Sequence, residues 1–209
     1  FGGPVEYTVT SEDGLNSETT TVYAYYDDTD GTNPAILIPD ADNARIAAMS
    51  GTAGENWTTY DYTNTGFTES LFKPSDIAYD AAGNIFVANS APDNTNNRYI
   101  RRFSSLPFEA TDGTTLTAVD ASVEVITIDP LRDRLYYLTG DLSTLFWIDV
   151  DGSGADSRVF TAGAGGDFEE FSTLALYGLD VAPDGSVYLV VSGDWESTPT
   201  PRLIQYNPY

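Results

Sequence analysis

The chain has 209 residues, 41% of them hydrophobic, and its 32 acidic and 9 basic residues give a net charge of −23. The hydrophobic fraction predicts a folded core, while the acidity argues against nucleic acid as a partner, because phosphate backbones would be repelled. The lack of cysteine and histidine excludes disulfides, thiol chemistry and histidine-based triads, so any metal would need oxygen ligands, which favours Ca²⁺ or Mg²⁺. No apolar run approaches the roughly 18 residues of a membrane span, and we expect no membrane insertion.

The acidity has two interpretations. It is explained by solubility in salty or extracellular surroundings, and it is also compatible with the binding of divalent cations. The chain begins at Phe1 and shows no signal peptide, which we interpret as a mature product or a part of a longer protein.

The first predicted element is a strand at residues 5–11, "VEYTVTS", within an N-terminal segment that we place at residues 1–20. From residue 21 onward the chain repeats a pattern of an apolar strand, a turn with Asp, Gly or Pro, and a second apolar strand. The clearest copies cover residues 76–90, 126–140 and 179–193, and a weaker copy covers 23–40. The second strands begin, at spacings of 49, 50 and 52 residues, at Ile36, Ile85, Leu135 and Val187. A period of this length filled with short strands is typical of β-propeller blades.

Each unit continues with a polar connection and a third strand, and the first three units add a fourth strand. We therefore predict an all-β fold, a β-propeller built of four-stranded antiparallel blades. The four visible blades are expected at about residues 21–70, 71–122, 123–174 and 175–209. Because the last unit stops after its third strand, the strand at 5–11 could complete it and close a small ring. The alternative is that these are consecutive blades of a larger ring.

The units resemble two propeller repeat families, the NHL and YWTD types. "PSDIAYDAAGNIFVANSAPDNTNNRYIRRFSS", at 74–105, resembles the NHL pattern of a strand, an Asp-Gly-Asn turn, a strand, an Asn-Arg pair and a third strand. "RLYYLTGDLSTLFWIDVDGSGADSRVFTAG", at 134–163, resembles a YWTD unit, with "LYYLTG" in the place of "LYWTD". The resemblance covers most of residues 21–209 and implies the fold, but propellers of these types serve in binding, scaffolding and catalysis alike.

Two further resemblances concern the N-terminal segment and a possible enzymatic relative. Residues 6–26 resemble the end of Ig-like modules in bacterial surface proteins, which would make residues 1–20 the end of a preceding module. The enzymatic relative to consider is the gluconolactonase-like propeller, a calcium-dependent lactonase with a Glu-Gly-Pro start and with Asn and Asp residues at the openings of inner strands. The corresponding places here read Gly2-Gly3-Pro4, Ser75-Asp76, Glu124-Val125 and Tyr177-Gly178. Only Asp76 offers a ligand, so the match fails where the chemistry would lie.

The segment "DVDGSGAD", at 149–156, has two interpretations. Asp149, Asp151 and Asp156 could offer oxygen ligands to Ca²⁺ at alternating positions. An EF-hand loop would also need a glutamate at its twelfth position, where this chain has Phe160, and no flanking helices are predicted. The other interpretation is a tight turn between the third and fourth strands of the blade.

The register of the repeat brings several connections to one face of the propeller, where function often lies because loops on a rigid scaffold are free of packing constraints. This predicted binding face carries Asp93, Asp141, Asp167, Asp194, Trp195 and Glu196. We expect Trp195 on a loop, where its indole could stack on a sugar ring or anchor a protein partner, or else fold back over the blade.

Together these patterns predict an extracellular or cell-surface module for binding or structural assembly, without catalysis. Its expected partners are a protein, a glycan or further copies of itself, and Ca²⁺ is the one cofactor to consider. The alternative is a divalent-metal-dependent hydrolase or lactonase of the gluconolactonase-like type.

Overall fold

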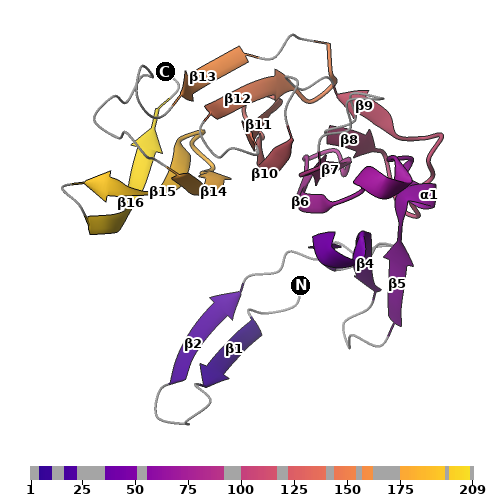
Figure 1. Cartoon of the computed structure of the whole chain (residues 1–209), viewed down its shortest axis with the longest axis horizontal. Helices are drawn as coiled ribbons and strands as arrows, with labels where there is room; N and C mark the ends of the chain where they lie inside the picture. The colour runs from indigo at the N-terminus through magenta and orange to yellow at the C-terminus, as the bar shows by residue number, and fades with distance from the viewer. Residues whose placement is uncertain are drawn as a thin grey trace.

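The computed structural model describes residues 5–10, 17–22, 36–50, 56–91, 100–116, 122–139, 144–153, 157–161, 175–195 and 198–207. These residues form five antiparallel sheets with a few short helical turns, which confirms the predicted all-β fold (Figure 1). Within these ranges, no helix is both long enough and apolar enough to cross a membrane.

Four of the sheets are meanders, in which strands that follow one another in sequence are hydrogen-bonded neighbours. Sheet 1 contains β3 (Ile36–Asp40), β4 (Arg45–Ser50) and β5 (Asn56–Tyr60). Sheet 2 contains β6 (Pro74–Tyr79), β7 (Ile85–Asn89), β8 (Ile100–Phe103) and β9 (Thr114–Leu116). Sheet 3 contains β10 (Val123–Asp129), β11 (Arg134–Thr139), β12 (Thr144–Asp149) and β13 (Ser157–Thr161). Sheet 4 contains β14 (Ala175–Val181), β15 (Val187–Trp195) and β16 (Thr198–Tyr206).

Short helices occur in two connections. The 3₁₀ turn η1 (Ala41–Asn43) joins β3 to β4, while α1 (Tyr62–Thr65) and the 3₁₀ turn η2 (Glu69–Leu71) lie between β5 and β6. Asp61 caps α1, because its carboxylate accepts a hydrogen bond of 2.8 Å from the N–H of Thr63.

The tight turns between first and second strands form as the repeat predicts. In sheet 2, the carboxylate of Asp80 accepts hydrogen bonds from the N–H groups of Ala82 and Asn84, at 2.9 and 2.8 Å, and Gly83 takes a φ of 85°. Glycine is favoured there because it adopts positive φ without steric cost. In sheet 3 four residues, 130–133, separate the last paired residues Asp129 and Arg134, and Asp133 takes the positive φ of 52°.

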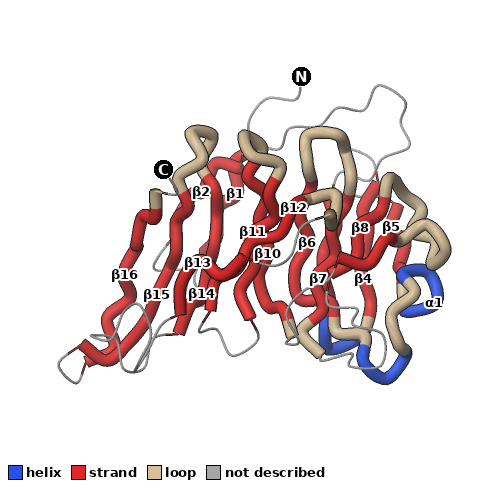
Figure 2. Tube along the Cα trace, turned by 90° about the horizontal axis from the view of Figure 1, so that it is seen from above, coloured by secondary structure: helices blue, strands red, loops and turns tan. Residues whose placement is uncertain are grey.

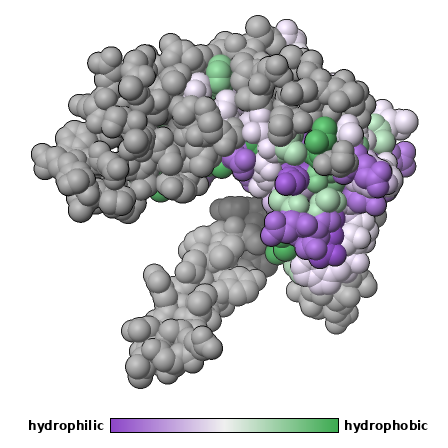
Figure 3. All heavy atoms as spheres, viewed as in Figure 1, coloured by the Kyte–Doolittle hydropathy of each residue, from purple (hydrophilic) through white to green (hydrophobic). Residues whose placement is uncertain are grey.

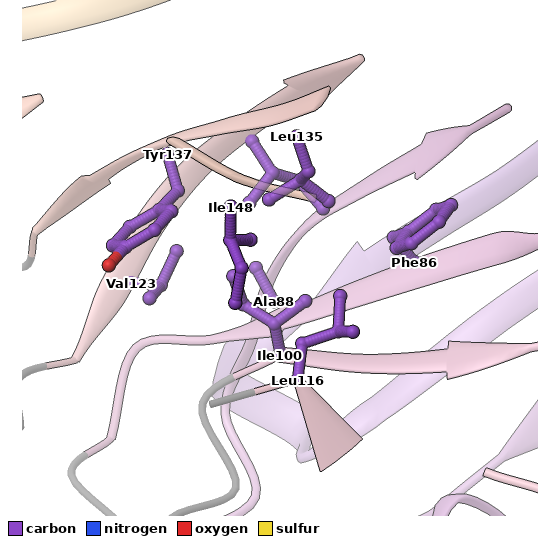
Figure 4. Close-up of a cluster of buried hydrophobic side chains, with 9 residues drawn as sticks. Phe86, Ala88, Ile100, Leu116, Val123, Leu135, Tyr137 and Ile148 are labelled. Atoms are coloured by element: carbon purple, nitrogen blue, oxygen red, sulfur yellow. The ribbon is translucent and has the colours of Figure 1, made fainter. Parts of the chain in front are cut away.

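The sheets pack face to face because residues of the second strands alternate between their two sides. In β7, Phe86 and Ala88 pack against sheet 3, whereas Ile85 and Val87 pack against sheet 1. Figure 4 shows the cluster between sheets 2 and 3, where side chains from β7, β8 and β9 meet Leu135, Tyr137 and Ile148. The residues of this cluster are buried, so the core of the molecule consists of layers between successive sheets.

The first strands lie on the inner side of the arrangement, where β6 contacts β10 and β10 contacts β14. Ile77, Ile126 and Leu179 lie on these inner strands. The four sheets follow one another along an arc (Figure 1). This is the arrangement of successive β-propeller blades.

The N-terminal strand does not pair with the last sheet. Instead β1 (Val5–Thr10) pairs with β2 (Ser17–Val22) in a two-stranded antiparallel sheet, with Val5 opposite Val22. The described strands of sheet 4 are β14, β15 and β16, so the strand at 5–11 does not close the ring in this structure. A local hairpin closes a shorter loop than a contact with the last sheet would, and it costs less chain entropy.

Candidate functional site

The two edges of the arc carry different kinds of connection. The tight turns between first and second strands lie on one edge, and the helical connection from β5 to β6 lies on the opposite edge (Figure 2). The first strands begin at this second edge. We call it the connection end, and its described residues are 61–76, 89–91, 122–124, 175–177 and 192–195.

Most residues of the predicted binding face lie outside the described residues: Asp93, Asp141, Asp167 and Glu196. The backbone of Asp194 and Trp195 is described, and it corrects one prediction. Trp195 is the last residue of β15, paired with Thr198 of β16, and not a loop residue. The pairing with β16 continues from Ser192 to Trp195, beyond the apolar pattern of β15.

Irregular backbone marks the start of each described first strand. The pairing of the first and second strands shifts register at Ser75 in β6, at Glu124 in β10 and at Tyr177 in β14. A β-bulge of this kind turns a side chain away from its regular direction, and bulges are frequent beside functional sites. Its recurrence at the same place in sheets 2, 3 and 4 makes these strand openings the candidate site.

The strand openings of sheets 2 and 3 are joined by side chains. The hydroxyl of Ser75 donates a hydrogen bond of 2.6 Å to the carbonyl oxygen of Val123. The carboxylate of Asp76 accepts hydrogen bonds from the N–H of Ile126, at 2.9 Å, and from the N–H of Ile77, at 2.8 Å. Ser75 and Asp76 therefore connect β6 to β10, two strands that are not neighbours in one sheet.

Two carboxyl groups at the strand openings are held in a partly buried environment. Burial raises the pKa of Asp76, although the N–H groups of Ile126 and Ile77 act in the opposite direction. Burial also raises the pKa of Glu124. Among the described side chains, neither group forms an ion pair, since the two ion pairs are Arg45–Asp40 and Arg132–Asp129. These two carboxyl groups make the strand openings acidic.

Asn89 anchors the connection that leads into this site. It lies at the end of β7, is fully buried, and accepts a hydrogen bond of 2.6 Å from the N–H of Lys73. Its amide nitrogen donates to the carbonyl oxygens of Leu71 and Ala91, at 2.9 and 2.7 Å. These bonds fix the backbone just before Ser75 and Asp76. A buried Asn at a strand end is a signal that sequence reasoning did not use.

The segment at 149–156 contains a tight turn in its described part. The carboxylate of Asp151 accepts a hydrogen bond of 2.8 Å from the N–H of Ser153, and Gly152 has a φ of 74°. Hydrogen bonds from Ser153, chiefly from its hydroxyl and then from its N–H, lower the pKa of Asp151, with a smaller contribution from the charge of Arg102. Asp156 lies outside the described residues, and no group of three acidic side chains that could hold a metal ion occurs in the part of the chain that is described.

The edge of sheet 1 shows how exposed acidic groups are paired. The Nε atom of Arg45 donates to the Asp40 carboxylate at 2.8 Å, and the side chain of Asn43 donates to both oxygens of the same carboxylate. These bonds lower the pKa of Asp40. Figure 3 shows hydrophilic side chains gathered around this start of β4. This surface is locally neutralised, unlike the openings at Asp76 and Glu124.

No family model and no curated protein matches the chain. Its fold is similar to that of solved β-propeller structures. A nidogen/laminin complex matches with a TM-score of 0.54 and 15% identity, over 82% of this chain and 61% of that chain. Hydrazine synthase of Kuenenia stuttgartiensis matches with a TM-score of 0.54 and 11% identity, over 97% of this chain and 50% of that chain. The chain therefore spans 61% and 50% of these two proteins, and at such identities the similarity establishes the β-propeller fold alone.

Proposed function

We propose that this β-propeller is a non-catalytic binding module of an extracellular or cell-surface protein, and that it engages a protein partner at the connection end. The observation that carries the proposal is the state of Asp76. This residue stands where the lactonase alternative needs a metal ligand, yet both of its oxygens accept backbone N–H groups. Its carboxylate is committed to joining β6 and β10, which favours a structural role over a catalytic one.

The charge of the chain indicates the chemistry of the partner. A net charge of −23 produces a negative potential that attracts a basic protein surface and accelerates its association. One of the similar folds comes from a complex of nidogen with laminin, so this fold is used in contacts between proteins. Trp195, at the tip of β15, is the aromatic residue that we assign as the anchor, since tryptophan is enriched among residues that dominate binding energies.

Affinity capture with matched variants tests this proposal. The double variant Asp194→Asn/Trp195→Ala removes one charge and the anchor at the connection end. The control Asp133→Asn/Asp184→Asn removes two exposed charges from the tight turns between β10 and β11 and between β14 and β15, at the opposite edge. We expect partners captured by the wild type to be retained by the control and lost with the double variant.

The alternative function gives the opposing result. If the purified chain hydrolyses lactones, and if EDTA abolishes this activity and Ca²⁺ restores it, the protein is a hydrolase and the proposal is wrong. Equal capture by the double variant and the wild type would also contradict binding at Asp194 and Trp195.

A further inference from the structure

The packing of the sheets has a direction that can be read from the second strands. In β11, Leu135 and Tyr137 pack toward sheet 2, whereas Tyr136 and Leu138 pack toward sheet 4. In β7, the residues at the corresponding places of the repeat pack in the same two directions. Each sheet thus has a leading face, which packs on the preceding sheet, and a trailing face, which packs on the following one.

Sheet 4 has an exposed trailing face. Val187, Leu189 and Val191 of β15 are buried against sheet 3, so the intervening residues Tyr188 and Val190 point to the opposite side. This side has a shallow hollow of about 330 Å³, lined by seven residues of β14, β15, β16 and the turn after β14: Gly178, Leu179, Asp180, Ala182, Tyr188, Val190 and Leu203. Val190 is 43% exposed and Leu203 is 67% exposed. The face that in sheets 2 and 3 buries the next sheet is covered by no other sheet among the described residues here.

Sheet 1 has an exposed leading face at the other end of the arc. Leu37, Ile46 and Ala48 pack toward sheet 2, so their neighbours in β3 and β4 point outward. Ile36 lies opposite Met49, which lies opposite Trp57, so these three apolar residues form one row across the outward side. Ile38 and Trp57 on this side are 42% and 54% exposed.

We propose that the trailing face of sheet 4 binds the leading face of sheet 1 from a second copy of this chain. The occupant follows from the interfaces within the molecule, because in sheets 2 and 3 the trailing face is covered by the leading face of another sheet of the same repeat. The contact joins two different surfaces, so it is heterologous. Two copies that contact each other at both ends would close a ring of four plus four sheets, which is within the range of blade numbers that propellers use. This surface is separate from the connection end, and the inference is independent of the function proposed there.

Three exposed side chains allow a matched test by sedimentation velocity. Leu203→Asp places a charge on the trailing face of sheet 4, and Trp57→Asp places one on the leading face of sheet 1. Leu131→Asp is the control, since Leu131 is 57% exposed in the turn between β10 and β11, away from both faces. We expect the wild type and the control to associate, and each of the other two variants to be monomeric.

Mixing the two monomeric variants provides the decisive result. Leu203→Asp retains an intact sheet 1 face and Trp57→Asp retains an intact sheet 4 face, so an equimolar mixture should form heterodimers. Association of the wild type should also strengthen with salt, because screening reduces the repulsion between two chains of net charge −23. Circular dichroism checks the fold of each variant, and Ile38→Asp replaces Trp57→Asp if that variant unfolds.

A wild type that stays monomeric at every salt and chain concentration overturns the proposal. A mixture that stays monomeric overturns it as well, since two copies would then associate through like surfaces or not at all. Loss of association in Leu131→Asp equal to that in Leu203→Asp would show an effect of charge alone, and it would also overturn the assignment.

Discussion

At the scale of single residues, part of the acidity of the chain serves the backbone. Asp80 and Asp184 each accept N–H groups in tight turns, and Asp76 accepts the N–H of Ile126 across two sheets. The turn residues could be predicted, because Asp and Gly recur at turns for local reasons. Neither the positive φ of Asp133 nor the bridging role of Asp76 could be predicted, because both depend on contacts that only the folded chain makes.

Asp76 and Asp184 are expected to affect stability with opposite pH dependence. The pKa of Asp76 is raised above 3.8 by burial, so the native state holds its proton at pH values where the unfolded chain has lost it. The wild type therefore loses stability as the pH rises from 3.8 through the raised pKa. The variant Asp76→Asn lacks this loss. As the pH rises from 3.8 through the raised pKa, the free energy of unfolding of the variant should therefore increase relative to that of the wild type.

Asp184→Asn is the control with the opposite sign. Hydrogen bonds from Ser186, chiefly from its N–H, lower the pKa of Asp184 below 3.8, so the wild type gains stability as the pH rises toward 3.8. As the pH rises toward 3.8, the free energy of unfolding of the wild type should therefore increase relative to that of Asp184→Asn. Urea unfolding at a series of pH values measures both, and shifts of the same sign in the two variants would contradict the assigned pKa directions.

At the scale of elements, the repeated apolar pattern predicted the second strands. The spacing of Ile36, Ile85, Leu135 and Val187 placed all four strands. The prediction of a loop at Trp195 was wrong, because strand pairing with Thr198 extends β15 where the sequence shows no alternation. The path of the connection into β6 could not be predicted from the sequence either, because it depends on the buried side chain of Asn89.

Replacing Asn89 should loosen this connection more than replacing its neighbour. Asn89→Ala leaves the N–H of Lys73 and the carbonyl oxygens of Leu71 and Ala91 without their partner in a buried place, which should cost about 2–3 kcal/mol. Ser90→Ala removes one exposed hydroxyl bond to the Lys73 carbonyl oxygen and should cost clearly less. Chemical denaturation of the two variants gives the comparison, and equal losses would argue against Asn89 as the anchor.

At the scale of the whole molecule, repetition of one unit predicted the β-propeller fold but not how its ends are arranged. The period fixed four successive sheets, and the cores between them follow from the alternation of the second strands. Closure of the ring would require the strand at 5–11 to pair with sheet 4, which is far away in the sequence. The local hairpin of β1 and β2 competes with that pairing. The exposed faces of sheets 1 and 4 therefore become apparent only from the arrangement of the four sheets in the structure.

The N-terminal hairpin should contribute little to the stability of the four sheets. Pairing within residues 5–22 joins β1 to β2, and neither strand extends the ladder of β14, β15 and β16. Removal of residues 1–22 should therefore leave the thermal midpoint of the remaining chain nearly unchanged. A strand that completed sheet 4 would instead contribute a full ladder of backbone hydrogen bonds, and a loss of only 1 kcal/mol would lower the midpoint by about 2–4 °C for a chain of this size. Calorimetry of the full and shortened chains, at one low concentration that prevents association, decides between these outcomes, and a decrease of several degrees would show that the hairpin region supports the arc.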